Sequence, residues 1–400
     1  MQYDLVFEGG GAKGMVFVGA MQEFEAQGHT PGRLLGTSAG AITAALLAAG
    51  YDSQEMLAAL NEKQDGHSVF AAFMGEPAPF PETEVRNSAT LALLRKVNIP
   101  LLPEFLESKL DEVLVGMLAK QPALRHIFSF IERGGWYSAD SFLTWMRRKL
   151  DEGVFNGAPR AFSGMTLAQL HAVTQADLSL IASDTTAGSI LVLNHRTAPD
   201  CPVVWAVRMS MNIPLLWQEV IWLPEWGLYR GKPLAGHAIV DGGMLSNFPM
   251  ELFVSSLASV TAVMGDKVSE RVLGLLIDES APVPGIEPPA APDAQALSLG
   301  SLQTLQRLMN LVNTMMQAHD KMVIDAFSRY VLRLPARGYG TTEFDMTDER
   351  REILVAAGRE MMRRYLDEAA DEMVSFGVPD AEAAAQAAAI ADRLAGRLLS

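Results

Sequence analysis

The sequence predicts an α/β fold in which helices cover both faces of a mainly parallel sheet. Strand and helix signals alternate over the first 50 residues, a pattern typical of parallel sheets. Apolar runs of strand type return later, at residues 178–185, 190–197, 237–243 and 271–280. With 400 residues, 49% of them hydrophobic, the chain can form one large domain with insertions or two domains.

The first predicted strand, YDLVF, leads directly into Gly9, Gly10 and Gly11, which are followed by Lys13 and Gly14. Gly9, Gly11 and Gly14 fit the G-x-G-x-x-G pattern of dinucleotide-binding turns. Such a site also needs an acidic residue at the end of the next strand, where this chain has a Gly-Thr-Ser sequence instead. Nucleotide binding is therefore the weaker interpretation of this turn.

The second predicted strand ends in Gly36-Thr37-Ser38-Ala39-Gly40 and passes into the helix-forming run AITAALLAAG. A G-x-S-x-G sequence between a strand and a helix is typical of a nucleophile turn, in which the flanking glycines leave room for a strained serine. The hydroxyl then lies at the positive end of the following helix. We therefore predict that Ser38 is a nucleophile, flanked by Gly36 and Gly40.

The three opening glycines have a different role if Ser38 is a nucleophile. Negative charge develops on the substrate carbonyl oxygen during acyl transfer, and backbone N–H groups stabilise it. Successive glycines suit such donors, because they adopt positive φ and allow the substrate to approach the chain closely. Gly9, Gly10 and Gly11 are therefore predicted to form an oxyanion hole, with a flexible loop as the alternative.

No histidine lies in a sequence that suggests a catalytic base for Ser38. The seven histidines are His29, His67, His126, His171, His195, His237 and His319. Instead, the apolar run HAIVDGG ends in Asp241, Gly242 and Gly243, an acid at the carboxyl end of a strand, where α/β sheets place ligand-binding groups. Asp241 is therefore the predicted partner of Ser38, and an ordinary β-turn is the alternative interpretation.

The motifs EGGGAKG, GTSAG and DGG, in this order, closely resemble those of the patatin-like phospholipase family. Residues 135–150, 178–194, 206–220 and 339–366 also resemble segments of its members. The resemblance implies a three-layer α/β/α sandwich and a serine hydrolase that cleaves acyl esters of phospholipids or related lipids through an acyl-enzyme. It also implies a Ser-Asp dyad rather than a triad, and no metal or organic cofactor.

The same resemblance assigns roles to individual residues. It makes Ser38 the nucleophile and Asp241 its base, with Gly9, Gly10 and Gly11 as the oxyanion hole. The supporting motif residues are Lys13, Gly14, Gly36, Gly40, Gly242 and Gly243. Glu8 stands where many members have aspartate, and we interpret it as an acid that supports the loop. A catalytically silent member that binds lipids or proteins is the alternative function, although both dyad residues are present.

The chain divides into three predicted regions. Residues 1–280 form a catalytic domain, residues 281–300 a linker or loop rich in proline and alanine, and residues 301–400 a mainly helical region that packs on the catalytic domain. Within the first region, residues 53–150 form a helical insertion divided by prolines. This insertion is either a packed subdomain or a lid that binds the acyl chain.

Aromatic side chains gather in residues 215–234, which contain Trp217, Trp222, Trp226 and Tyr229. Such side chains suit a core or a pocket wall, and they also suit the boundary between lipid and water. We expect this segment and the helical insertion to flank the entrance of the site and to bind the acyl chain.

Net charge and cysteine content limit the partners and the cellular compartment that we expect for this chain. A formal net charge of −15 argues against nucleic acid as a partner and against broad docking on anionic membranes, so contact with a lipid surface is expected to be local and transient. The single cysteine, Cys201, suits a reducing compartment. Because no signal peptide or membrane span is evident, we expect a soluble cytoplasmic protein. The sequence leaves open the oligomeric state, the head-group and acyl-position preference, any need for an activator, the physiological role, and export by a route without a cleaved signal.

Overall fold

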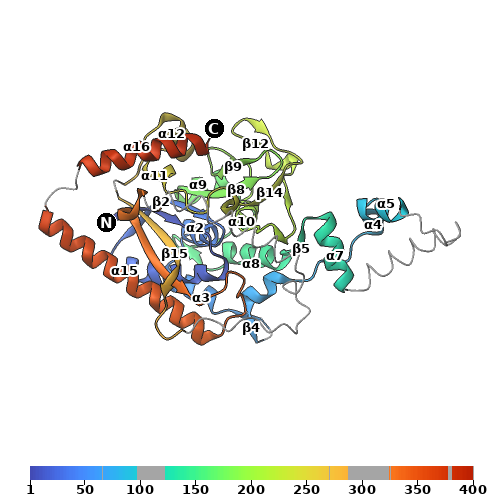
Figure 1. The fold of residues 1–400 in the computed structure, drawn as a ribbon, viewed down its shortest axis with the longest axis horizontal. Coiled ribbons are helices and arrows are strands. Elements are labelled where there is room, and N and C mark those ends of the chain that lie inside the picture. The colour runs from blue at the N-terminus through green and yellow to red at the C-terminus, as the bar shows by residue number, and fades with distance from the viewer. Residues whose placement is uncertain are drawn as a thin grey trace.

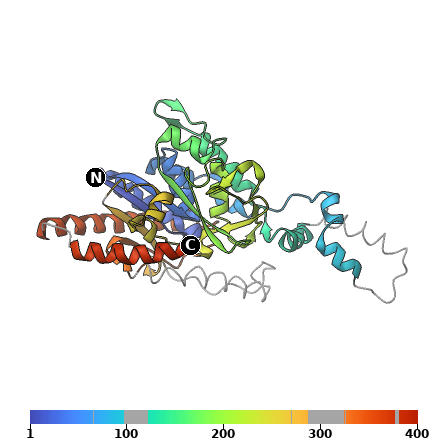
Figure 2. The ribbon, with the colours of Figure 1, turned by 90° about the horizontal axis from the view of Figure 1, so that it is seen from above.

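The central feature of the fold is one mixed sheet with helices on both faces (Figures 1 and 2). The computed structural model describes residues 1–96, 122–286 and 324–399, apart from residues 65, 270, 325 and 377–380. The sheet consists of β1 (Gln2–Phe7), β2 (Thr30–Thr37), β8 (Leu178–Asp184), β9 (Ser189–Leu193), β11 (Val220–Ile221), β14 (Ala238–Asp241), β15 (Val272–Pro282) and β16 (Val331–Arg337).

Following hydrogen-bonded neighbours, the strands connect in the order β11-β14-β8-β2-β1-β15-β16, and β9 also pairs with β8. β8 thus has three partners, two of which share one of its edges. The five strands from β8 to β16 in this order are parallel to one another, whereas β9 and β14 run antiparallel to β8. The predicted α/β class with a mainly parallel sheet is therefore confirmed.

The sheet brings the ends of two strands together on one edge of β8. β9 pairs with the other edge of β8 throughout residues 180–184. On the shared edge, β2 pairs as far as Thr37 opposite Ile181, and β14 arrives from the opposite direction to place Asp241 opposite Ala182. The carboxyl ends of β2 and β14 therefore meet head to head, at neighbouring residues of β8.

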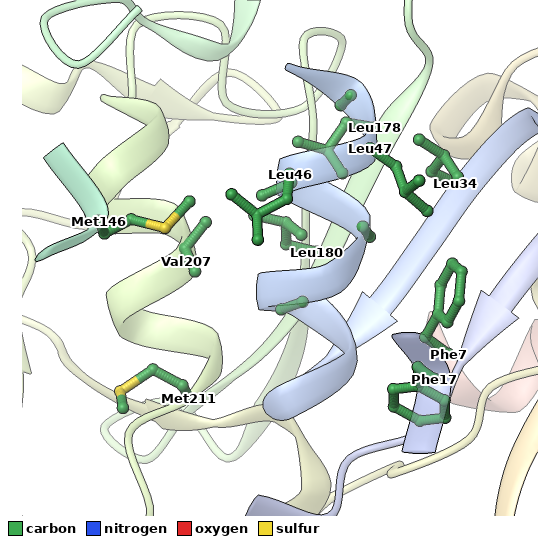
Figure 3. Packing of buried hydrophobic residues seen from close by; sticks show 14 of the residues in the cluster. Phe7, Phe17, Leu34, Leu46, Leu47, Met146, Leu178, Leu180, Val207 and Met211 are labelled. Atoms are coloured by element: carbon green, nitrogen blue, oxygen red, sulfur yellow. The ribbon is translucent and has the colours of Figure 1, made fainter. Parts of the chain in front are cut away.

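Alternate side chains of the strands enter two different cores. Leu5 and Phe7 of β1 belong to the larger core, together with residues of α1 (Val16–Ala26), α2 (Ala39–Ala48), α8 (Asp140–Asp151), α10 (Val203–Ser210) and α15 (Asp348–Phe376). Figure 3 shows α2 between Phe7 and Leu34 on one side and Met146 and Val207 on the other. Val6 belongs to the second core, under α11 (Glu251–Val254), α12 (Ala258–Met264) and α16 (Ala381–Leu398).

The remaining described elements lie mostly in the connections. The helices are α3 (Ser53–Leu60), α4 (Glu82–Arg86), α5 (Ala89–Lys96), α7 (Pro122–Glu132) and α9 (Leu167–Thr174), with 3-10 turns η1 (Gly11–Met15), η2 (Val69–Met74), η3 (Pro224–Trp226), η4 (Gly242–Met244) and η6 (Ser328–Tyr330). Short strand pairs are β3 (Lys63–Gln64) with β4 (His67–Ser68), β5 (Gly135–Tyr137) with β10 (Leu215–Trp217), β6 (Val154–Phe155) with β7 (Ala158–Pro159), and β12 (Leu228–Tyr229) with β13 (Lys232–Pro233).

The three regions predicted from the sequence differ in how much of them is described. The insertion at residues 53–150 contains short helices, of which α4, α5 and α7 extend away from the sheet (Figures 1 and 2); its residues 97–121 lie outside the described part. β15 continues to Pro282, and residues 287–300 of the predicted linker are not described. The C-terminal region, predicted to be mainly helical, also contributes β16, a strand of the central sheet that was not expected from the sequence.

A buried ion pair joins the start of the sheet to the helices beneath it. Asp4 of β1 accepts hydrogen bonds from the backbone N–H and from Nε of Arg33 in β2, both at 2.8 Å. The guanidinium also donates to the carbonyl of Phe253 and lies 4.2 Å from the centre of its ring. Since both charged side chains are buried, each depends on the other for compensation.

Replacement of Asp4 by asparagine should leave the Arg33 guanidinium buried without its anion. We expect Asp4→Asn to lower the free energy of unfolding by about 3–5 kcal/mol, measured by urea denaturation. Glu82→Gln, which removes the partner of an exposed pair with Arg86, is the control and should have a much smaller effect. Similar losses in the two variants would contradict the structural role of the buried pair.

Candidate active site

Ser38 is held in a strained backbone conformation between β2 and α2. Its φ is 53° and its ψ is −119°, in a region that non-glycine residues rarely occupy. The backbone N–H of Ser38 donates to the hydroxyl of Ser210 at 3.1 Å, and the side chain is 2% exposed. The turn thus presents the hydroxyl at the N-terminus of α2, in a buried position.

The glycines of the two opening motifs allow the chain to pack closely around Ser38. A Cβ atom on Gly40 would lie 2.3 Å from the carbonyl oxygen of Phe7, the last residue of β1. Gly36 lies against the main chain of Gly40, and Gly14 lies against Ala39. The end of β1, the glycine-rich turn after it and the serine turn are therefore in direct contact.

Asp241 is fully buried at the end of β14. Its Oδ1 accepts from the N–H of Gly243 at 2.8 Å, and its own N–H donates to the carbonyl of Asn212 at 2.9 Å. Oδ2 has no partner with hydrogen-bond geometry among the described residues. Burial raises the pKa of the carboxyl to about 7, against the smaller lowering effects of the Ser38 hydroxyl and the Gly243 N–H. This acid can therefore gain or lose a proton near neutral pH.

Some N–H groups of the glycine-rich turn form hydrogen bonds with the surrounding main chain, and others do not. Gly9 donates to the carbonyl of Asn247 at 3.3 Å, so its N–H is already used. Ala12 donates to Thr341, and Lys13 to Gly10. Within the described part of the chain, the N–H groups of Gly10 and Gly11 make no such bond. Of the three glycines predicted as oxyanion donors, Gly10 and Gly11 are thus the two with free N–H groups.

Residues from distant parts of the sequence hold this turn. Glu8 accepts from the N–H of Ile277 at 2.6 Å and from Nδ2 of Asn247 at 3.3 Å. Nδ2 of Asn247 also donates to the carbonyl of Gly9 at 3.0 Å. Lys13, which is buried, forms an ion pair with Glu279 of β15. These contacts fix the turn to the sheet on one side and to the segment after Asp241 on the other.

Three residues with a role at the site were missed in the sequence analysis. Asn247 holds the glycine turn, Ser210 accepts the N–H of Ser38, and Asn212 accepts the N–H of Asp241. The sequence carries a signal for Ser210 and Asn247, which are polar residues next to apolar ones in RMSMNIP and MLSNFPM. Asn212 accepts the N–H of Asp241 through its main chain, which any residue could provide. All three side chains are buried, and each takes part in a hydrogen bond, which makes a polar residue tolerable in its position.

The described histidines do not contribute to the site. His237, which is nearest to Asp241 in the sequence, pairs through Nδ1 with Asp184 at 2.7 Å. His171 and His195 stack on one another with ring centres 3.6 Å apart. His319 lies outside the described residues. Among the residues that the structure describes, the side chain that acts on the Asp241 carboxyl is that of Ser38.

An apolar cavity opens onto Ser38. Its lining residues come from the glycine turn and α1 (Gly11, Ala12, Gly14, Met15, Val18), from the serine turn and α2 (Ser38, Ala39, Ile42, Thr43, Leu46), from the insertion (Met56, Ala59, Leu60, Phe70, Phe73, Trp145) and from later segments (Met211, Ile213, Trp217, Phe344). No acidic or basic side chain occurs among these described lining residues. The cavity therefore suits a hydrocarbon chain.

The aromatic segment at residues 215–234 behaves differently from the expectation that it binds the acyl chain. Trp217 lines the cavity, but Trp222 and Trp226 do not. Both are buried and pack against one another, with ring centres 5.8 Å apart. The exposed apolar side chains of this segment are instead Ile221, Leu223 and Leu228. Trp222 and Trp226 support the fold, so they are core residues rather than part of the entrance.

The described residues also bear on metal binding and on membrane crossing. In the described ranges, no group of three or more histidine, cysteine, aspartate or glutamate side chains is arranged to hold a metal ion. Over the same residues, none of the helices has the combination of length and apolar character that crossing a bilayer requires.

Comparison with known proteins gives one family, one curated relative and several similar solved structures. The sequence model of the family described as patatin-like phospholipase matches residues 5–254. The uncharacterized protein YqhO of Bacillus subtilis is 27% identical over 375 residues, which are 92% of this chain and 98% of YqhO. Two solved structures are similar over 92% of this chain: VipD from Legionella pneumophila (18% identity, TM-score 0.43, 67% of its chain) and the type III effector ExoU (16% identity, TM-score 0.40, 53% of its chain).

Replacement of Asp241 by asparagine should change how stability depends on pH. The pKa of about 7 in the folded chain exceeds the value of about 4 expected for an unfolded chain, so between these values the folded chain binds more protons. The contribution of the Asp241 carboxyl to the free energy of unfolding of the wild type is fully present below pH 4, and it is lost as the pH rises from 4 to 7. The free energy of unfolding of Asp241→Asn relative to wild type should therefore rise by up to about 1.4 kcal/mol per pH unit between pH 4 and 7, and stay constant above pH 7. Urea denaturation at a series of pH values measures this difference, and a constant difference across the whole range would contradict the assignment.

Proposed function

The chain belongs to the patatin-like phospholipase family, and on that premise we propose that it is a lipid acyl hydrolase with a Ser38–Asp241 dyad. The substrate is an acyl ester of a phospholipid or related lipid. The observation that carries the proposal is the pairing of a strained, buried serine with a buried carboxyl group of raised pKa, where the serine lines an apolar cavity. Strained nucleophiles and shifted pKa values are typical of catalytic sites.

Asp241 acts as the base in this mechanism. Its Oδ2 takes the proton of the Ser38 hydroxyl as Oγ bonds to the carbonyl carbon of the ester, and the carbonyl electrons move to the oxygen. A carboxyl group with a pKa of about 7 is a far better base than an ordinary aspartate, because its proton affinity is higher while it is still ionised at neutral pH. The missing partner of Oδ2 leaves a lone pair available for this proton.

The tetrahedral intermediate is stabilised by the chain around Ser38. The N–H groups of Gly10 and Gly11 serve as oxyanion donors, each worth about 3 kcal/mol in well-studied hydrolases. The N-terminus of α2 adds a positive partial charge at the same point. Asn247 and Glu8 hold the glycine turn in place before the substrate arrives, so the donors need little rearrangement during the reaction.

Collapse of the intermediate breaks the bond to the alcohol, and the leaving oxygen takes the proton from Asp241. Water then attacks the acyl-enzyme and gives a proton to Asp241, which returns it to Ser38 as the fatty acid leaves. The acyl chain occupies the apolar cavity, since its lining would leave a charged head group without partners. The head group of a phospholipid substrate therefore remains outside the cavity.

Loss of the Ser38 hydroxyl should remove the reaction and leave the fold intact. We expect Ser38→Ala to hydrolyse a soluble short-chain ester at less than about one thousandth of the wild-type rate, because covalent catalysis is lost. A fluorophosphonate probe should label wild type and the control Ser189→Ala, whose serine is exposed on β9, but not Ser38→Ala. Labelling of Ser38→Ala, or retention of more than a few per cent of the rate, would rule out Ser38 as the nucleophile.

Incubation of wild type with mixed phospholipids, followed by identification of released fatty acids, tests the substrate class.

The pH dependence of the rate should report the Asp241 carboxyl. Because this group must be ionised to accept the serine proton, kcat/KM for a soluble ester should fall about tenfold per pH unit below pH 7 and level off above it. Asp241→Asn should be inactive over the whole range, and His237→Ala should keep substantial activity because His237 pairs with Asp184. Inactivity of a folded His237→Ala variant would replace the dyad by a triad.

A further inference from the structure

We propose that residues 338–347, between β16 and α15, form the wall of the acyl pocket that limits bulk beside the ester carbonyl, with Phe344 as the side chain that contacts the acyl group. This segment, here called the strap, lies outside residues 5–254, which match the family. The proposal rests on the proposed function, since it names a specificity-determining residue of the same site.

The strap touches the glycine turn through its main chain. The carbonyl of Thr341 accepts the N–H of Ala12 at 2.9 Å. Gly11 has a φ of 56°, and a Cβ atom there would lie 2.1 Å from the same carbonyl oxygen. Thr341 is thus in contact with the turn that carries the two free N–H groups. Residues close to Thr341 in the strap are therefore near the reacting end of the cavity.

Phe344 follows Thr341 by three residues and lines the cavity together with Ser38 and Gly11. Its ring centre lies 5.8 Å from that of Trp217, another lining residue. Trp217 is itself held by a 2.9 Å hydrogen bond from Nε1 to the carbonyl of Phe73. The two rings thus form one wall of the cavity, in which the Phe344 ring packs against a Trp217 ring that is held in place.

The strap is also fixed at its far end. Within it, Glu343 binds the guanidinium of Arg350, and the Tyr339 hydroxyl donates to the carbonyl of Arg350. Just after it, Arg351 of α15 donates to Oδ1 of Asn61 at 2.9 Å, and Asp348 pairs with Lys63. The strap therefore connects the glycine turn to the helical insertion.

A fixed aromatic wall beside the nucleophile accepts a straight acyl chain more readily than one with a branch next to the carbonyl. A methyl branch at that position would have to enter space that the Phe344 ring fills. Hydrophobic pockets discriminate single carbon groups by about tenfold or more, so the effect is large enough to measure.

The test compares a linear acyl ester with its 2-methyl-branched counterpart of the same chain length and alcohol. For Phe344→Ala, the ratio of kcat/KM for the branched ester to that for the linear ester should rise about tenfold over wild type. Phe344→Leu should give a smaller rise in the same direction, and it keeps the test valid if the alanine variant does not fold. Met346→Ala is the matched control, because Met346 is equally buried in the strap but does not line the cavity, so its ratio should equal that of wild type.

Binding of the free fatty acids gives a readout that does not need catalysis. In a Ser38→Ala background, displacement of a fluorescent fatty acid by the linear and 2-methyl acids should show the same change in selectivity with Phe344→Ala. If wild type hydrolyses neither ester but binding selectivity shifts, the proposed function is wrong while the pocket wall is correct. If folded Phe344→Ala and Phe344→Leu change neither the hydrolysis ratio nor the binding ratio, the proposal is overturned.

Discussion

The head-to-head meeting of β2 and β14 on one edge of β8 is the constraint on which the site depends. Two strands cannot continue past each other on the same edge, so both must end there and turn away. Asp241 is the last residue of β14, opposite Ala182 of β8, and Ser38 directly follows Thr37, which lies opposite Ile181. Closeness of the serine and the acid is thus a property of strand pairing. The surrounding strands and helices bury both residues, and this burial raises the pKa of the acid.

Burial of this carboxyl has a cost in stability that the rest of the structure must offset. The Gly243 N–H donates to its Oδ1, whereas the Asn212 carbonyl accepts the N–H of Asp241 and the Ser210 hydroxyl accepts the N–H of Ser38. One oxygen atom is left without a protein partner with hydrogen-bond geometry in the described residues. An arrangement of this kind is unfavourable for folding alone and is typical of sites whose polar groups serve a reaction.

Local motifs were enough to predict the α/β class and the turns at Ser38 and Asp241, because each depends on residues adjacent in the sequence. Contacts between distant segments could not be predicted in the same way. Asn247 and Thr341 form hydrogen bonds with the glycine turn because the fold brings them next to it, and no sequence pattern relates their positions to the turn. Trp222 and Trp226 show another limit, because an aromatic cluster reads alike whether it faces lipid or a neighbouring ring.

The position of β15 and β16 has a consequence for how the chain folds as it is synthesised. β1 lies in the middle of the sheet, with β2 on one side and β15 on the other. Its first neighbour is complete after residue 37, but its second is residues 272–282, and β16 comes later still. Until then, one edge of β1 has no strand to pair with and could bind another chain instead. The serine turn is therefore synthesised long before the sheet is complete. Formation of the compact fold depends on the pairing of β1 with β15, two strands far apart in the sequence.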